Sequence, residues 1–145
     1  MKPIAITMGE LAGISGEITL KTWRQVKDNG FPLVALDNVE RLKNITTELN
    51  ISLSIVQVNE PIDAIEIYKD ALPVYNIDLH HPPKPGHLSE INAKSTIESI
   101  EKATSFAKAG LVSGLVTNPI NKKNLYDAGF KYPGHTEYLA AMSGE

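Results

Sequence analysis

The sequence predicts an α/β fold, a three-layer αβα sandwich built around a mostly parallel sheet. Short runs rich in β-branched residues alternate with segments of helical periodicity through most of the 145 residues. The almost wholly apolar run at 111–117 directly follows the longest helical segment, as expected for a strand buried on both faces. Strands that are joined through helices in this way run parallel, with right-handed crossovers.

In the first half of the chain, strands are predicted to alternate with helices. Strand-length runs lie at 3–8, 31–36 and 53–58. Three glycines follow the first of these strands: Gly9, Gly13 and Gly16. They join it to a helix that we expect to begin near Glu17. Asp37 or Asn38 can cap the helix after the second strand. The periodicity of 62–75 does not decide between helix and strand.

The second half is predicted to begin with a loop and to continue mostly as helix. The loop, at about 76–89, connects the two halves and contains Pro82, Pro83, Pro85 and Gly86. Ser89 can cap the longest helix, which has apolar residues at helical spacing. Asn121 can cap a short helix at 122–128, and a last helix is expected to begin near Thr136.

Composition excludes several classes of protein. The 14 Lys and Arg against 17 Asp and Glu give a formal net charge of −3, and no segment concentrates basic residues. We therefore expect no nucleic-acid partner. No apolar run approaches the roughly 20 residues of a membrane span, and the first residues lack a signal-peptide pattern, so we expect no membrane partner. The absence of cysteine excludes a disulfide and a cysteine nucleophile, and favours a cytoplasmic location.

The first candidate binding site is the glycine-rich segment at 7–17, TMGELAGISGE. It joins a strand to a helix whose free N–H groups could receive a phosphate or a carboxylate. The glycines are spaced by four and then three residues, whereas the dinucleotide-binding fingerprint requires two and then three, and the P-loop lysine is absent. A simple chain reversal explains the same pattern, so both interpretations stay open.

The second candidate site follows the last predicted strand. Thr117 and Asn118 lie at its carboxyl end, where open α/β sheets bind ligands. Lys122 can project a cation from the next helix, and His135 and Thr136 follow a Pro-Gly turn. Together these side chains could hold a phosphate or a carboxylate by charge-assisted hydrogen bonds. The alternative is that they are surface charges, turn residues and a loop histidine.

The other histidines do not suggest a metal site. His80, His81 and His87 lie in the proline-rich loop with Asp78 nearby. Adjacent histidines in an extended loop point in different directions and cannot easily share one ion. We therefore predict no metal ligands within this chain, and no Ser-His-Asp or paired-carboxylate arrangement can be assembled.

Three segments resemble the 4-hydroxythreonine-4-phosphate dehydrogenase family of pyridoxal phosphate biosynthesis. VTNPINKKNLYDAGFKYPGHTEYLA, at 116–140, resembles the family's T-x-P-I-x-K, A-G and P-G-H-T-E motifs without a gap. ITMGELAGISGE, at 6–17, is similar to its G-(D/E)-P-A-G-I-G-x-E loop, and PGHLSEINAKSTIESIEKA, at 85–103, is similar to the stretch before its long helix. Three positions depart from the family pattern: Leu11, Ser15 and Ala93. They fit only if the backbone there avoids positive φ.

The resemblance implies an isocitrate/isopropylmalate dehydrogenase-like fold, with 1–145 as the amino-terminal part of a two-lobed enzyme and its second half absent. It implies NAD(P)-dependent oxidation and decarboxylation of 4-phosphooxy-L-threonine to 3-amino-2-oxopropyl phosphate in pyridoxine 5'-phosphate biosynthesis. The family's substrate-binding pair falls on His135 and Thr136, and Lys122 matches its motif lysine. We assign Lys122 to the phosphate or carboxylate from its charge and position.

The resemblance also implies a divalent metal ion (Zn, Mg or Co) and a homodimer in the complete enzyme. The family's metal-ligating histidines and most coenzyme contacts lie downstream of residue 145, so we expect the short chain to be an inactive piece of a longer enzyme. Its unpaired sheet edge should promote self-association. One alternative is a dehydrogenase for a related four-carbon acid phosphate. Another is a truncated, non-catalytic module that binds phosphate esters or a partner.

Overall fold

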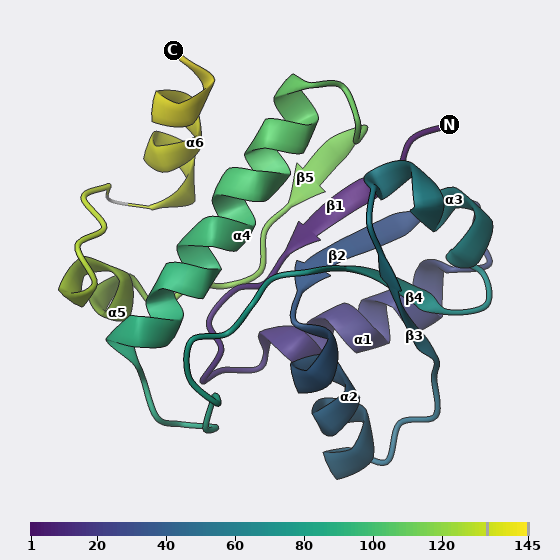
Figure 1. The fold of residues 1–145 in the computed structure, drawn as a ribbon, viewed down its shortest axis with the longest axis horizontal. Coiled ribbons are helices and arrows are strands. Elements are labelled where there is room, and N and C mark those ends of the chain that lie inside the picture. Colours follow the sequence, from purple (N-terminus) through teal and green to yellow (C-terminus); the bar gives the residue numbers. More distant parts are fainter. Residues whose placement is uncertain (133, 145) are drawn as a thin grey trace.

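A five-stranded parallel sheet lies at the centre of the computed structural model, which describes residues 1–132 and 134–144 (Figure 1). Its strand order is β3-β4-β2-β1-β5, and every neighbouring pair is parallel. The strands are β1 (Ile4–Thr7), β2 (Leu33–Asp37), β3 (Ile55–Val58), β4 (Leu72–Asn76) and β5 (Gly114–Val116). The predicted parallel sheet is thus confirmed.

Helices cover both faces of this sheet, which confirms the three-layer sandwich. α1 (Ser15–Val26) and α2 (Val39–Glu48) pack on one face, and α4 (Glu90–Lys108) crosses the other (Figure 1). Strand β2 shows why two layers are needed. Its residues 33 and 35 belong to the buried cluster of α1 and α2, whereas 34 and 36 belong to the cluster of α4. A central parallel strand is therefore apolar on both sides.

The remaining helices are short: η1 (Pro61–Asp63), α3 (Ala64–Ile67), α5 (Lys122–Asp127) and α6 (His135–Ser143). α5 and α6 lie beyond α4 in Figure 1 and share a separate buried cluster with it. The cluster consists of Ala93, Ile100, Leu125, Phe130 and Tyr138. The Tyr138 hydroxyl also bonds the Glu101 carboxylate of α4 at 2.8 Å. α4 is thus the element that joins this helical pair to the sheet.

Three predicted helix caps are confirmed: Asn38, Ser89 and Asn121. Each side-chain oxygen accepts a hydrogen bond from the backbone N–H three residues later, at 2.9, 3.3 and 2.9 Å respectively.

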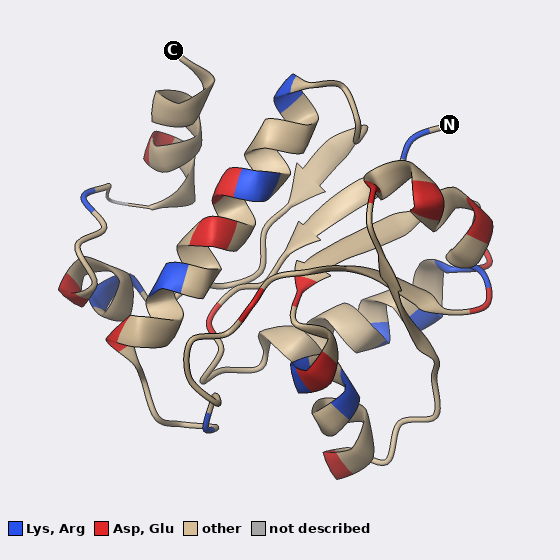
Figure 2. Ribbon diagram, viewed as in Figure 1, with Lys and Arg blue, Asp and Glu red and all other residues tan. Residues whose placement is uncertain are grey.

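The loop between β4 and α4 contains only an isolated bridge between Lys84 and His87. Acidic and basic residues are interspersed along α4 and α2 (Figure 2).

The last strand differs from its prediction. β5 has three residues and lies at the edge of the sheet, and the Val116 side chain is 50% exposed. The expected central strand, buried on both faces, is therefore wrong. The strand is short because the Leu111 N–H still bonds Phe106 O at the end of α4, at 2.9 Å, so the first part of the apolar run lies outside the strand.

Two smaller differences concern the start of α1 and the stretch 62–75, whose periodicity does not decide between helix and strand. α1 begins at Ser15, two residues before the expected start, and 62–75 contributes to η1, α3 and β4. Leu11, Ser15 and Ala93 all avoid positive φ, as the family comparison required. No helix of the described part is both long and apolar enough to cross a membrane.

Candidate functional site

The loop between β1 and α1 is packed tightly against the segment that follows β5. Gly9 has φ of 71°, and a Cβ atom at this position would lie 2.6 Å from Asn118 Cβ and 2.9 Å from Pro119 O. The neighbouring Glu10 N–H donates to Pro119 O at 2.9 Å. A side chain at Gly9 is therefore excluded both by its backbone conformation and by lack of space.

Asn118 fixes this junction from the other side. Its buried side-chain amide donates to Thr7 O and to Thr19 Oγ1, both at 2.8 Å. Its backbone N–H donates to Thr7 Oγ1 at 3.2 Å. Because both amide hydrogens are used within the protein, Asn118 holds the ends of β1 and β5 together and has a structural role.

Lys122 begins α5 and is exposed. Its Cε and Nζ atoms lie 3.8 and 4.0 Å from the point where Gly134 would carry a Cβ. Within the described residues, Lys122 forms no ion pair, whereas its neighbour Lys123 pairs with Asp127 at 3.0 Å. The structure thus places the Lys122 ammonium group beside the residue that precedes His135, and the Glu137 carboxylate lies there too, with Oε2 3.6 Å from the same point.

His135 is the first residue of α6 and is half-buried. Its Nε2 atom is buried, and no described residue forms a hydrogen bond with it. Burial lowers the pKa of His135 below its usual value, so the imidazole is neutral at pH 7. A neutral histidine with a free ring nitrogen can accept or donate one hydrogen bond, depending on its tautomer.

Thr136 is exposed and lines a groove between α4, α6 and the edge strand β5. The side chains of Thr104, Leu115 and Leu139 also line this groove. The structure therefore places Lys122, at the start of α5, beside the start of α6, where His135 lies, whereas the Thr136 side chain lines the groove against α4 and β5. Their roles in binding stay a prediction.

The described residues do not fit a metal ion by themselves. No group of three His, Asp or Glu side chains within 1–132 and 134–144 is arranged to hold one. His80, His81 and His87 are all exposed in the loop before α4. No catalytic step can therefore be derived through a metal held by this chain.

A buried ion pair near the start of α1 could not be located from the sequence. Arg41 Nη1 lies 2.8 Å from both carboxylate oxygens of Asp37, and its Nη2 donates to Ser15 Oγ at 2.9 Å. Burial raises the pKa of Asp37, although Arg41 and the Asn38 N–H act in the opposite direction. Ser15, which departs from the family pattern, thus gives Arg41 its third contact.

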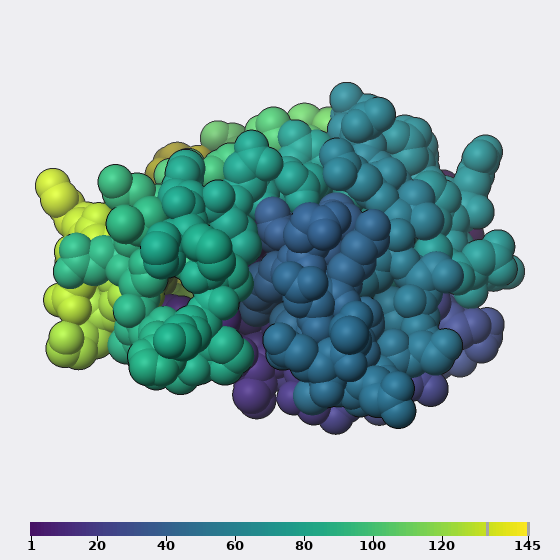
Figure 3. All heavy atoms as spheres, turned by 60° about the horizontal axis from the view of Figure 1, so that its bottom comes forward, coloured from purple at the N-terminus to yellow at the C-terminus, as the bar shows by residue number. Residues whose placement is uncertain are grey.

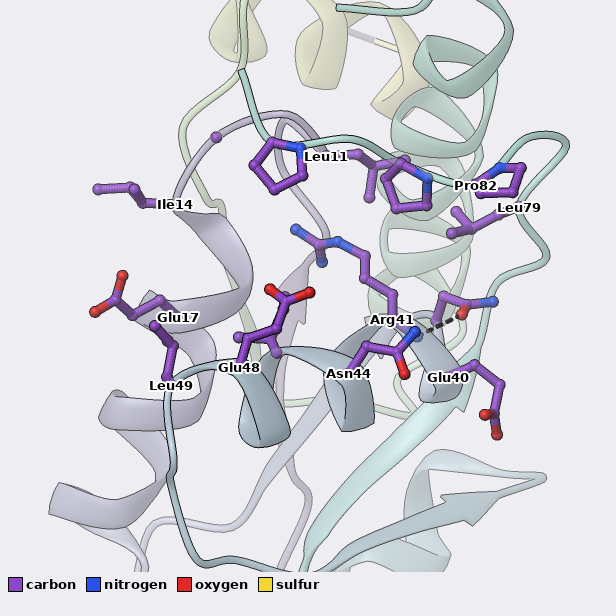
Figure 4. Close-up of a pocket in the computed structure, with 15 residues that line it drawn as sticks. Leu11, Ile14, Glu17, Glu40, Arg41, Asn44, Glu48, Leu49, Leu79 and Pro82 are labelled. Atoms are coloured by element: carbon purple, nitrogen blue, oxygen red, sulfur yellow. Dashed lines mark hydrogen bonds between the residues drawn. The ribbon is translucent and has the colours of Figure 1, made fainter. Parts of the chain in front are cut away.

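A groove of about 490 Å³ adjoins Arg41, between α1, α2 and the proline-rich loop (Figure 4). Prolines and leucines form its apolar part, and Glu17, Glu40 and Glu48 lie around it. The labelled glutamates and Arg41 come from α1 and α2, whereas Pro82 comes from the loop. This groove lies apart from Lys122, His135 and Thr136, none of which lines it.

Comparison with known proteins identifies the family. The family model "Pyridoxal phosphate biosynthetic protein PdxA" matches residues 30–145. The 4-hydroxythreonine-4-phosphate dehydrogenase of Caulobacter vibrioides is 37% identical over 142 residues, which are 98% of this chain and 41% of that protein. The enzyme of the same name from Zymomonas mobilis is 34% identical, over 99% of this chain and 42% of its own length.

Solved structures agree with this assignment. The 4-hydroxythreonine-4-phosphate dehydrogenase of Klebsiella pneumoniae superposes with a TM-score of 0.90 at 32% identity, over 99% of this chain and 45% of that one. The enzyme of that name from Burkholderia phymatum gives 0.90 at 26% identity, over 99% and 44%. The chain spans about two-fifths of the length of the relatives it matches. It belongs to the PdxA family of pyridoxal phosphate biosynthetic proteins.

Proposed function

We propose that this chain supplies part of the substrate site of a 4-hydroxythreonine-4-phosphate dehydrogenase. Whole relatives carry that name, and this chain spans less than half of their length. The proposal is supported by one observation above all. Among the described residues, the Lys122 ammonium forms no ion pair and His135 Nε2 has no hydrogen-bond partner, and these two residues begin the separate helices α5 and α6.

The anionic groups of the substrate are the natural ligands for this junction. An unpaired ammonium group such as that of Lys122 attracts a phosphate or carboxylate and donates charge-assisted hydrogen bonds to it. Neutral His135 can bond a hydroxyl or phosphate oxygen through Nε2, and the Thr136 hydroxyl can add a further bond. In this assignment the three residues bind and orient the substrate.

The complete reaction is proposed for the whole protein. It would be an NAD(P)-dependent oxidation of the secondary alcohol, followed by decarboxylation to 3-amino-2-oxopropyl phosphate. A bound nicotinamide would supply the hydride acceptor, and a divalent ion held outside these residues would supply positive charge beside the substrate oxygen. We propose that the metal ligands lie outside these residues and that the complete enzyme acts as a cytoplasmic homodimer.

Binding of 4-phosphooxy-L-threonine to this chain, measured by calorimetry, tests the substrate site. Lys122→Ala should weaken the affinity about tenfold or more, because it removes a charge-assisted hydrogen bond. The matched control is Lys123→Ala, which removes the same charge from the neighbouring residue, where the ammonium is already paired with Asp127. We expect the control to leave the affinity unchanged.

Two results would refute this assignment of Lys122. An equal loss in both lysine variants would indicate a general effect of charge, and unchanged affinity in Lys122→Ala would remove the residue from the site. His135→Gln provides an independent check, since it should also weaken binding while leaving the lysines in place.

A further inference from the structure

The turn that joins α1 to β2 contains Asn29, the only asparagine of the sequence that is followed by glycine. Asn29 and Gly30 are both exposed. In the space-filling view, the purple-blue atoms at the end of α1 belong to the surface, at the right of the view (Figure 3). Gly30 has φ of 79°, and a Cβ atom at this position would meet no described residue within 4 Å. The turn is therefore open to water and not enclosed by other elements.

The backbone nitrogen of Gly30 is not engaged in this turn. Among the described residues its N–H donates no hydrogen bond, whereas the Asn29 N–H donates to Val26 O at 2.9 Å. The Asn29 side-chain amide makes only a long hydrogen bond, from Nδ2 to Gln25 O at 3.5 Å. A free backbone nitrogen therefore follows directly after a weakly held side-chain amide.

Asn50 provides a contrast at the end of α2. It is also exposed, and it has φ of 53° in the turn after its helix. The residue that follows it, Ile51, donates its N–H to Thr46 O at 2.9 Å. The β-branched side chain of Ile51 also crowds its own backbone. The two exposed turns thus differ at the nitrogen after the asparagine, which is free in one and bonded in the other.

A free backbone nitrogen next to asparagine can attack the side-chain amide carbon. The Gly30 nitrogen forms a bond to Asn29 Cγ, the bond from Cγ to Nδ2 breaks, and ammonia leaves with the proton of the Gly30 N–H. The product is a succinimide ring. Water then opens the ring at either carbonyl carbon, which gives aspartate or isoaspartate. Glycine favours this step because it has no Cβ atom beside the nitrogen and its backbone adopts many conformations.

We propose that Asn29 is a site of covalent self-modification, at which the folded chain loses ammonia and forms aspartate and isoaspartate. This inference is independent of the proposed function. The product adds a negative charge beside Asp28, just beyond the carboxyl end of α1, where the helix dipole disfavours it. Isoaspartate also lengthens the main chain before Pro32, whose oxygen accepts from the Ile4 N–H at 2.9 Å. The modified chain should therefore be less stable than the unmodified chain.

Peptide mass spectrometry of the folded chain, aged in mildly alkaline buffer, tests the inference. Residue 29 should show the mass change from an amide to a carboxylic acid, with part of the product as isoaspartate. Asn50 in the same sample is the internal control and should keep its amide. Asn29→Gln should abolish the change at position 29, because a longer side chain does not form the five-membered ring.

Ageing the same chain in urea separates the effect of the fold from that of the local sequence. Asn29 should convert at a similar rate in the folded and the unfolded chain. Unfolding should accelerate the change at Asn50, because it releases the Ile51 N–H from Thr46. If Asn29 converts only in urea, the folded turn protects it and the inference is overturned. Equal rates for Asn29 and Asn50 in the folded chain would overturn it as well.

Thermal unfolding measures the consequence for the protein. The aged chain should unfold at a lower temperature than the fresh chain, in proportion to the fraction converted at position 29. Asn29→Gln keeps a neutral amide in the turn, so it should have the same midpoint before and after ageing. An equal decrease in the aged variant would assign the loss to another residue and would contradict the expected effect of this site.

Discussion

The sheet with α1 and α2 differs from the α5–α6 pair in how it is held together. The sheet half has parallel ladders between all neighbouring strands and two buried clusters, one on each face. The α5–α6 pair shares one buried cluster with α4 and is held by hydrogen bonds that include Tyr138 to Glu101, Lys108 to Met142 O and Asn124 to Glu10. All three residues of the proposed substrate site lie in the second region.

Because of this difference, we expect the sheet half to provide most of the stability of the chain and the α5–α6 pair to provide the binding residues. Regions that bury few apolar residues open with a lower free energy than the core, and binding segments are often drawn from them. The Asn118 contacts and the hydrogen bond from Thr96 of α4 to Gly9 O then position the α5–α6 pair relative to the sheet. The site should therefore be able to adjust without unfolding the sheet.

The largest effect is expected for Leu20→Ala in α1. Leu20 is fully buried in the cluster between the sheet, α1 and α2. Removing its side chain leaves a cavity and should lower the free energy of unfolding by about 2–5 kcal/mol. Chemical denaturation measures this loss. Amide hydrogen exchange should become faster in all strands together. Faster exchange that is confined to α1 would show that the sheet half does not unfold as one cooperative unit.

A smaller and more local effect is expected for Leu125→Ala in α5. Leu125 is also fully buried, but in the cluster of α4, α5 and α6. The cavity should open this cluster, so that amides of 118–144 exchange faster while those of β1 and β2 keep their protection. If the strands lose protection to the same extent, the two regions unfold as one unit and the contrast between them is refuted.

The smallest effect concerns pH. Burial lowers the pKa of His135 in the folded chain, so the unfolded chain binds this proton more readily. Stability should therefore fall as the pH decreases below about 6.5, the ordinary histidine value, until the folded-state pKa is passed. Urea denaturation between pH 8 and pH 5 measures this slope. His135→Gln should be less sensitive over that range, and an equal slope in both chains would assign the effect to other groups.

The sequence predicted the elements whose patterns are local. Asn38, Ser89 and Asn121 are caps because the bond that each makes lies within three residues. The position of β5 could not be found in this way, because strand order depends on pairing between distant segments. An apolar run alone does not distinguish a central strand from an edge strand that follows a turn.

The site was predictable in part, for a similar reason. Lys122 and His135 belong to recognisable motifs, and the structure brings them together through Gly134. The Asp37 and Arg41 pair and the unsatisfied Asn92 oxygen carry no sequence signal of their own. Asn92 lies in a helix like any polar residue, and only the folded structure shows that its buried oxygen has no donor among the described residues.

The hydroxyl groups of Thr96 and Ser99 on α4 also affect the order of folding. Thr96 donates to Gly9 O, and Ser99 donates to Leu36 O and accepts from the Met8 N–H, so these bonds join residues 87, 63 and 91 positions apart along the chain. Contacts of such long range close large loops and form slowly. We therefore expect β1 and β2 to pair first and α4 to dock later. The α5–α6 pair, which shares its buried cluster with α4, then assembles last.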